Sequence, residues 1–159
     1  MNSSVPVRLA PDDPRLPAVL ALVQRCFAGM QGRVDPPSSM HRLTVEAIAE
    51  QARKGEVWIC GDPPVACMFL SIRDGRLYLG KLSVDSTARG QGLARQLMDL
   101  AETRARALGL NEIEVKVRIE LTENHATFTM LGFTIAHSGS HEGYDRPTYV
   151  VMRKPVGLA

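Results

Sequence analysis

The sequence has few of the features that mark membrane, metal-binding or secreted proteins. No apolar run approaches the roughly 18 residues that a bilayer-crossing helix needs. Cysteines number only three, Cys26, Cys60 and Cys67, and none has the spacing of a metal site. Residues 1–4 are polar and lack the apolar core of a secretory signal. An odd cysteine count without such a signal is typical of a reducing compartment, so we predict a cytoplasmic protein with no metal and no membrane partner.

Strong charge of one sign is also missing. The formal net charge is +2 and no long basic run occurs, so nucleic acid is not an expected partner. The composition is otherwise ordinary, with 45% hydrophobic and 23% charged residues among 159. This length and the lack of repeats or linkers predict one domain over residues 1–159. Nothing decides the oligomeric state, and we keep a homodimer as a hypothesis because dimers are the commonest assembly.

Hydrophobic periodicity predicts eleven elements in the order βααβββαβαββ. The expected helices cover residues 12–27, a segment from Ser39 or Thr44 to 54, 90–108 and 124–131. The expected strands cover residues 5–9, 56–60, 65–73, 77–84, 112–120, 133–137 and 148–154. Asp74-Gly75 is a hairpin signal inside an antiparallel meander. The helix over 90–108 has an apolar stripe that we assign to Leu93, Leu97, Leu100, Ala101 and Leu108.

That helix also crosses over between two strands expected to be parallel neighbours. The predicted fold class is therefore α/β (α+β), with a mixed, mostly antiparallel sheet and helices on both of its faces.

The most informative segment is Arg89-Gly-Gln-Gly-Leu-Ala94, which joins an apolar strand to that helix. A helix N-terminus has unpaired N–H groups and a partial positive charge, so it binds phosphates. The segment lacks the GxxxxGK[ST] pattern of a Walker loop. A dinucleotide fingerprint would need a small residue where Arg95 stands, so that interpretation fails as well.

The hexamer does match the pattern [QR]xxGx[GA], with Arg89, Gly92 and Ala94 at its fixed positions. Together with the preceding Leu82-Ser-Val84, it resembles motif A of the GNAT superfamily of acyl-CoA-dependent N-acyltransferases. Downstream, Asn124, Phe128 and Gly132-Phe133 resemble a second segment of that family. The element order is the superfamily's order, so the resemblance covers about residues 5–154.

The resemblance implies that acetyl-CoA is the co-substrate and that the amides of residues 90–94 hold its pyrophosphate. It also implies that the strand over 82–84 diverges from the strand over 113–119, leaving a gap for the pantetheine arm. The coenzyme A contacts implied are Leu82, Ser83, Val84, Arg89, Gly90, Gln91, Gly92, Leu93, Ala94, Arg95, Asn124 and Phe128. Asn124 has an alternative role as the N-cap of its helix.

The match departs from the family at Phe128, which stands where a tyrosine often protonates the leaving sulfur. We therefore assign neither a general acid nor a general base, and keep Tyr144, His141 and Glu120 as candidates. His41, Arg42 and Tyr144 are candidates for acceptor contacts, on two loops that could equally be solvated connections.

The function expected from these residues is transfer of an acetyl group to an amine of a small molecule or a protein. The alternative is a coenzyme A-binding module without catalysis, which Phe128 favours. The third hypothesis is a protein-interaction domain whose segment 89–94 binds no ligand. The intact Arg89, Gly92 and Ala94 argue against it.

Overall fold

The computed structural model describes residues 5–157, so the polar segment 1–4 used in the compartment prediction lies outside the described residues. The strands are β1 (Val7–Arg8), β2 (Glu56–Cys60), β3 (Ala66–Arg73), β4 (Arg76–Val84), β5 (Glu112–Arg118), β6 (Thr134–Gly139) and β7 (Tyr149–Pro155). The helices are α1 (Leu16–Phe27), α2 (Val45–Lys54), α3 (Leu93–Ala107) and α4 (Thr122–Met130). The order βααβββαβαββ is confirmed.

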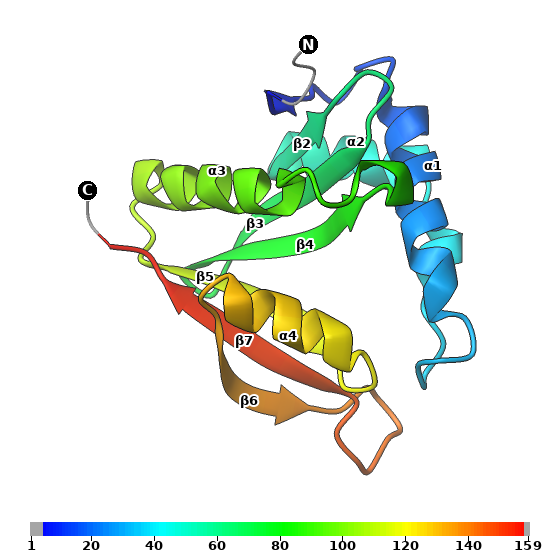
Figure 1. The fold of residues 1–159 in the computed structure, drawn as a ribbon, viewed down its shortest axis with the longest axis vertical. Helices are drawn as coiled ribbons and strands as arrows, with labels where there is room; N and C mark the ends of the chain where they lie inside the picture. Colours follow the sequence, from blue (N-terminus) through cyan, green and yellow to red (C-terminus); the bar gives the residue numbers. More distant parts are fainter. Residues whose placement is uncertain (1–4, 158–159) are drawn as a thin grey trace.

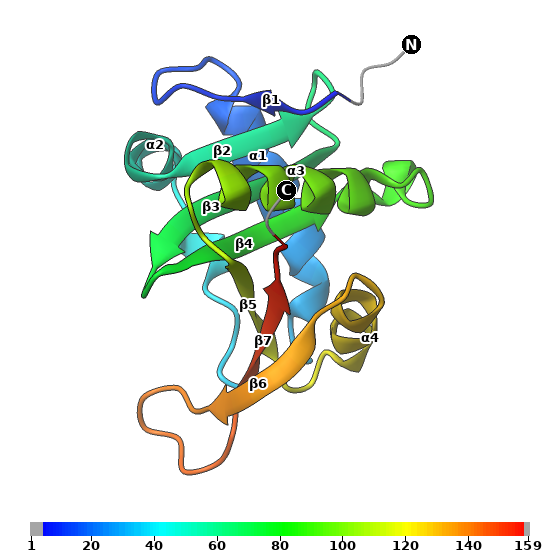
Figure 2. The ribbon, with the colours of Figure 1, turned by 90° about the vertical axis from the view of Figure 1, so that its left-hand side faces the viewer.

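The strands form one mixed sheet in the order β1-β2-β3-β4-β5-β7-β6. All neighbours are antiparallel except β4 and β5, which run parallel with α3 as the crossover between them. Helices α3 and α4 cover one face, while α1 and α2 cover the other, as Figures 1 and 2 show. The predicted fold class is confirmed.

Two apolar cores correspond to the two faces of the sheet. The larger core joins α3 to the inner residues of β4, β5 and β7, and the smaller core joins α1 and α2 to β2 and β3. The predicted stripe of α3 is right for Leu93, Leu97 and Ala101. It is wrong for Leu108, which is 38% exposed because α3 ends at Ala107.

Several predicted boundaries need correction. Helix α1 begins at Leu16 rather than at residue 12, α3 begins at Leu93 rather than at residue 90, and β5 ends at Arg118 rather than at residue 120. Strand β1 is shorter than the expected 5–9, because Pro6 has no N–H to donate and only Val7 and Arg8 pair with β2. Of the two expected starts of α2, the later one is right, since the Thr44 hydroxyl accepts from the Ala47 amide as an N-cap. Helix α4 begins at Thr122, two residues before its expected start.

The sheet and α3 are tied together by an ion pair around Glu56, which is 5% exposed. Arg104 donates from Nε and Nη2 to its carboxylate at 2.9 and 2.6 Å, and the Trp58 indole donates at 2.7 Å. Burial alone would raise the pKa of Glu56, but these donors outweigh it and the pKa is lowered. The pair therefore stabilises the fold above the unfolded pKa, near 4.3, and that contribution is lost as the pH falls through the folded value.

We expect Arg104→Ala to lower the free energy of unfolding by about 3 kcal/mol, because it leaves a buried carboxylate without its principal cation, with only the Trp58 indole and the more distant Arg8 beside it. Urea unfolding at pH 7 measures this. The control is Arg53→Ala, which removes an exposed pair with Glu50 on α2 and should cost below about 1 kcal/mol. Equal losses in the two variants would contradict the role given to Glu56.

Candidate active site

The site lies where β4 and β5 separate. Their parallel pairing joins only Leu77 to Ile113 and Tyr78 to Glu114. Beyond Tyr78, β4 has an irregularity at Lys81, whose φ is +55°, opposite a register shift in β3. The two strands therefore diverge toward their C-terminal ends, as the resemblance implied and as Figure 1 shows. Two connected cavities lie in this opening.

The first, here called the cradle cavity, has a volume of about 690 Å³. It is bounded by the end of β4, the loop before α3, the first turn of α3, and α4. From the predicted coenzyme A contacts it gathers Leu82, Ser83, Val84, Arg89, Gly90, Gly92, Leu93, Ala94, Arg95, Asn124 and Phe128. Only Gln91 of that set is not among the lining residues and is exposed.

The backbone of the cradle is shaped by two glycines. Gly90 and Gly92 have φ values of +81° and +76°, which is the left-handed region that favours glycine. A Cβ added to either would meet no described atom within 4 Å, so its direction is toward open space. Gly92 is also the N-cap residue of α3, so the helix terminus faces this space.

The amides of this segment have no acceptors among residues 5–157. The first amide of α3 that has an acceptor is that of Gln96, which donates to the Gly92 carbonyl at 3.0 Å. The amides from Gly90 to Ala94 are thus free to donate to an anion at the positive end of α3. The residues present fit a pyrophosphate.

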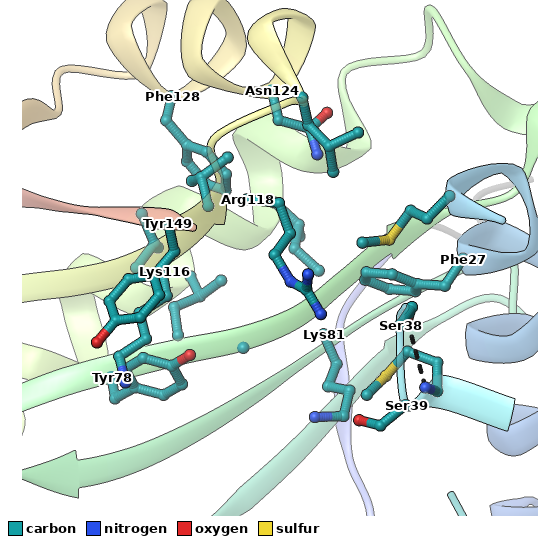
Figure 3. Close-up of a pocket in the computed structure, with 18 of the residues that line it drawn as sticks. Phe27, Ser38, Ser39, Tyr78, Lys81, Lys116, Arg118, Asn124, Phe128 and Tyr149 are labelled. Atoms are coloured by element: carbon teal, nitrogen blue, oxygen red, sulfur yellow. Dashed lines mark hydrogen bonds between the residues drawn. The ribbon is translucent and has the colours of Figure 1, made fainter. Parts of the chain in front are cut away.

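The second cavity, here called the loop cavity, has a volume of about 480 Å³ and opens on the sheet face that α1 and α2 cover elsewhere. Its walls come from β4, β5 and the start of β7, from the segment 38–40, and from the β6–β7 connection at Ser140 and His141. Tyr78 and Tyr149 form an aromatic wall at one end, and Phe27 lies at the other (Figure 3).

The cavities share six residues, so they form one continuous passage: Phe27, Met30, Leu82, Leu121, Asn124 and Phe128. Phe128 is half-buried and packs edge-on against Phe133 with ring centroids 5.4 Å apart. Asn124 lies inside α4, whose N-cap is Leu121, so its alternative role as a cap is wrong. Asn124 and Phe128 both contribute to the junction of the two cavities.

Cationic side chains that we did not predict as site residues line the loop cavity. Lys81, Lys116 and Arg118 are all among its lining residues, and the Arg118 side chain extends toward Lys81 (Figure 3). Burial lowers the pKa of Lys81 and that of Arg118. The alternation of polar and apolar residues along β5 predicts that Lys116 and Arg118 lie on one face of the sheet. Lys81 reaches the same face only because of the irregularity in β4.

Of Tyr144, His141 and Glu120, the structure brings only His141 to the loop cavity. Its Nδ1 lies 2.5 Å from the hydroxyl of the buried Thr148, and its ring packs edge-on against Tyr149. Burial first, and then the charges of Arg118 and Lys116, lower the pKa of His141 below its ordinary value near 6.5. The ring is therefore mostly neutral at pH 7 and can accept a proton.

The other candidates lie outside the linings of both cavities. The Tyr144 hydroxyl donates to Asp35 at 2.6 Å, which raises the pKa of Tyr144. Glu120 accepts a hydrogen bond from the Asp35 amide at 3.2 Å, so it contacts the same residue as Tyr144 does. His41 and Arg42 are exposed on a turn near α1.

Comparison with known proteins agrees with this geometry. Residues 17–133 match the model of the Acetyltransferase (GNAT) family. The chain belongs to this family. The comparison with curated protein sequences gave no match.

Solved structures share the GNAT fold at low sequence identity. The ribosomal-protein-S18-alanine N-acetyltransferase of Escherichia coli is 20% identical, with a TM-score of 0.68 over 100% of this chain and 96% of its own. Ard1 of Thermoplasma volcanium is 16% identical, with a TM-score of 0.73 over 96% and 97%. The IAA acetyltransferase of Bacillus cereus is 16% identical, with a TM-score of 0.63 over 95% and 98%. At these identities the likeness establishes the fold, and the GNAT acetyltransferase family supports acyl transfer in general.

Within residues 5–157, no helix is both long and apolar enough to span a bilayer. In the same part of the chain, no group of three or more His, Cys, Asp or Glu side chains is placed to hold a metal ion.

Proposed function

We propose that this protein is an N-acetyltransferase that transfers an acetyl group from acetyl-CoA to the amine of a small molecule. The observation that carries the proposal is the continuous passage between the cradle cavity and the loop cavity. One end presents free amides to a pyrophosphate, and the other end is a side-chain-lined pocket of a size suited to a small molecule. The two meet at Leu82, Asn124 and Phe128.

Coenzyme A, when bound, supplies the activated acetyl group as a thioester. The amides from Gly90 to Ala94 bind its diphosphate, and Arg89 and Arg95 add positive charge beside them. The main chain of residues 82–84 lines the opening where β4 has left β5, so its free edge can pair with the pantetheine amides. These contacts orient the thioester toward the loop cavity.

Attack on the thioester requires a neutral amine. His141 is neutral at pH 7 and Thr148 fixes its ring, so it serves as the base, directly or through a water molecule. In the proposed mechanism, a main-chain amide of β4 near Leu82 donates to the negative charge that develops on the thioester oxygen. Phe128 cannot donate a proton, so the sulfur leaves as a thiolate.

A thiol-release assay with acetyl-CoA and a panel of amines tests this proposal. We expect release that depends on the amine, with the acetylated amine detected by mass spectrometry. Tight binding of coenzyme A without turnover on any amine would instead favour the non-catalytic module, for which the phenylalanine at position 128 is the specific observation.

Phe128→Tyr tests whether proton donation to the sulfur limits the rate. The ring lies at the junction of the cavities, so a hydroxyl there would be close to the departing thiolate. We expect kcat to change less than about threefold, because a coenzyme A thiolate leaves without help near neutral pH. A rise in kcat of tenfold or more, measured at saturating acetyl-CoA, would show that the chain lacks an acid it needs.

A further inference from the structure

We infer that the acceptor is a small amine that also carries a carboxylate, as an amino acid does, and that Lys81, Lys116 and Arg118 recognise that group. The inference rests on the proposed function for the transfer step. It concerns the loop cavity, where these three cations occur together.

The distribution of unpaired cations is the first argument. Of the 19 Lys and Arg side chains, 12 form ion pairs with carboxylates of residues 5–157. Five of the other seven line the two cavities. Arg89 and Arg95 line the cradle cavity, where the pyrophosphate is proposed, and Lys81, Lys116 and Arg118 line the loop cavity. Unpaired cations that line a cavity are suited to bind an anion, so we expect Lys81, Lys116 and Arg118 to bind one in the loop cavity as well.

The loop cavity has no carboxylate among its lining residues to neutralise that charge. Two nearby acidic groups are engaged elsewhere: Glu114 accepts from Arg153 at 2.9 Å, and Asp35 accepts from Arg146 and Tyr144 at 2.7 and 2.6 Å. Glu120 accepts from the Asp35 amide through Oε2, while its Oε1 is buried without a partner and its charge acts on Arg118 from outside the lining of the cavity. A ligand with an anionic group supplies the missing charge.

Each cation has donors left for such a ligand. Arg118 donates to the Pro36 carbonyl at 2.5 Å and approaches that of Pro37 at 3.5 Å, which leaves others of its five N–H groups free. The Lys81 ammonium has no acceptor among residues 5–157 and lies 5.9 Å from the centroid of the Phe69 ring. The Lys116 ammonium lies 5.0 Å from the centroid of the Tyr149 ring. A bound carboxylate would offset the desolvation that lowers the pKa of Lys81.

The same charges favour the reactive form of the amine. Nearby cations lower the pKa of an ammonium group, so a larger fraction of the bound acceptor is in the neutral form that attacks the thioester. A protonated amine with no carboxylate, or a diammonium, gains no such attraction and is repelled by the three cations. The structure thus links selection of an anionic acceptor to activation of its amine.

Matched acceptor pairs test the inference. We expect each preferred amino acid to be acetylated with a kcat/KM roughly 10- to 100-fold above that of its carboxamide, as for loss of a charged hydrogen bond. Lys116→Glu should abolish or reverse this preference, and Lys116→Gln should reduce it. The control is Lys54→Glu, which makes the same charge change on exposed α2. Equal rates for acids and amides in the unmodified protein would overturn the inference while leaving the proposed function intact.

A binding measurement separates the two proposals if no amine is acetylated. Calorimetry on protein saturated with coenzyme A would compare N-acetyl amino acids with their carboxamides. Preference for the acids, lost in Lys116→Glu, supports the charge recognition even if turnover is absent and the catalytic proposal has failed. Binding of neither compound, or equal binding of both, rejects it.

Discussion

Gly92→Glu should abolish coenzyme A binding, with a loss of affinity above roughly 100-fold, because it places a carboxylate where the pyrophosphate is proposed to bind. The position lines the cradle cavity, and a Cβ there would point into open space rather than into the protein. Two effects add: like-charge repulsion at a site built for an anion, and obstruction of the amides that donate to it. Calorimetry with coenzyme A measures the change.

The control for this variant is Gly109→Glu, at the opposite end of α3. Gly109 has a φ of +73°, close to the +76° of Gly92, and a Cβ there also meets nothing within 4 Å. Both variants carry the same new charge and similar left-handed strain, on the order of 1–3 kcal/mol. Only Gly92→Glu should lose the ligand. Unchanged affinity in that variant would overturn the assignment of the cradle.

His141→Gln should lower kcat/KM by roughly 100-fold, within the range for loss of a general base. Its pKa is lowered by burial and by two neighbouring cations, so the neutral, proton-accepting form is present above a value that lies below 6.5. In the unmodified protein kcat/KM should therefore fall as the pH drops through that value, and this acidic limb should be absent from the variant. Glutamine retains a polar side chain beside Thr148 but cannot take up the proton.

His137→Gln provides the comparison, because His137 is exposed on β6 and lines neither cavity. Its pH profile should match that of the unmodified protein. An acidic limb that persists unchanged in His141→Gln would place the base on another group.

The donor side of this protein could be predicted from sequence because its chemistry is local. Gly90 and Gly92 follow a strand and precede a helix, and that order alone fixes where their amides point. Phe128 and Asn124 are four residues apart on one helix, so they were expected to face the same space, and both line the passage. The order of elements follows from periodicity, and with it the parallel neighbours β4 and β5.

The acceptor side could not be predicted in the same way because it depends on long-range placement. Lys81 enters the loop cavity through an irregularity of β4 that no residue type in the sequence marks. Tyr144 and His141 belong to one loop but have different surroundings. Asp35, from a loop far away in the sequence, binds Tyr144 outside the cavity. Thr148 contacts the His141 ring, which lines the cavity. Arg146, from the same loop as Tyr144, also pairs with Asp35, at 2.7 Å. Loops from different parts of the chain decide which side chains meet.

A crystal structure of the protein with coenzyme A bound tests the central claim most directly. We expect the pyrophosphate to accept from the amides of residues 90–94, the pantetheine to lie between β4 and α4, and the thiol to end near Leu82 and Phe128, facing the loop cavity. Coenzyme A bound elsewhere, or a thiol directed away from that junction, would contradict it.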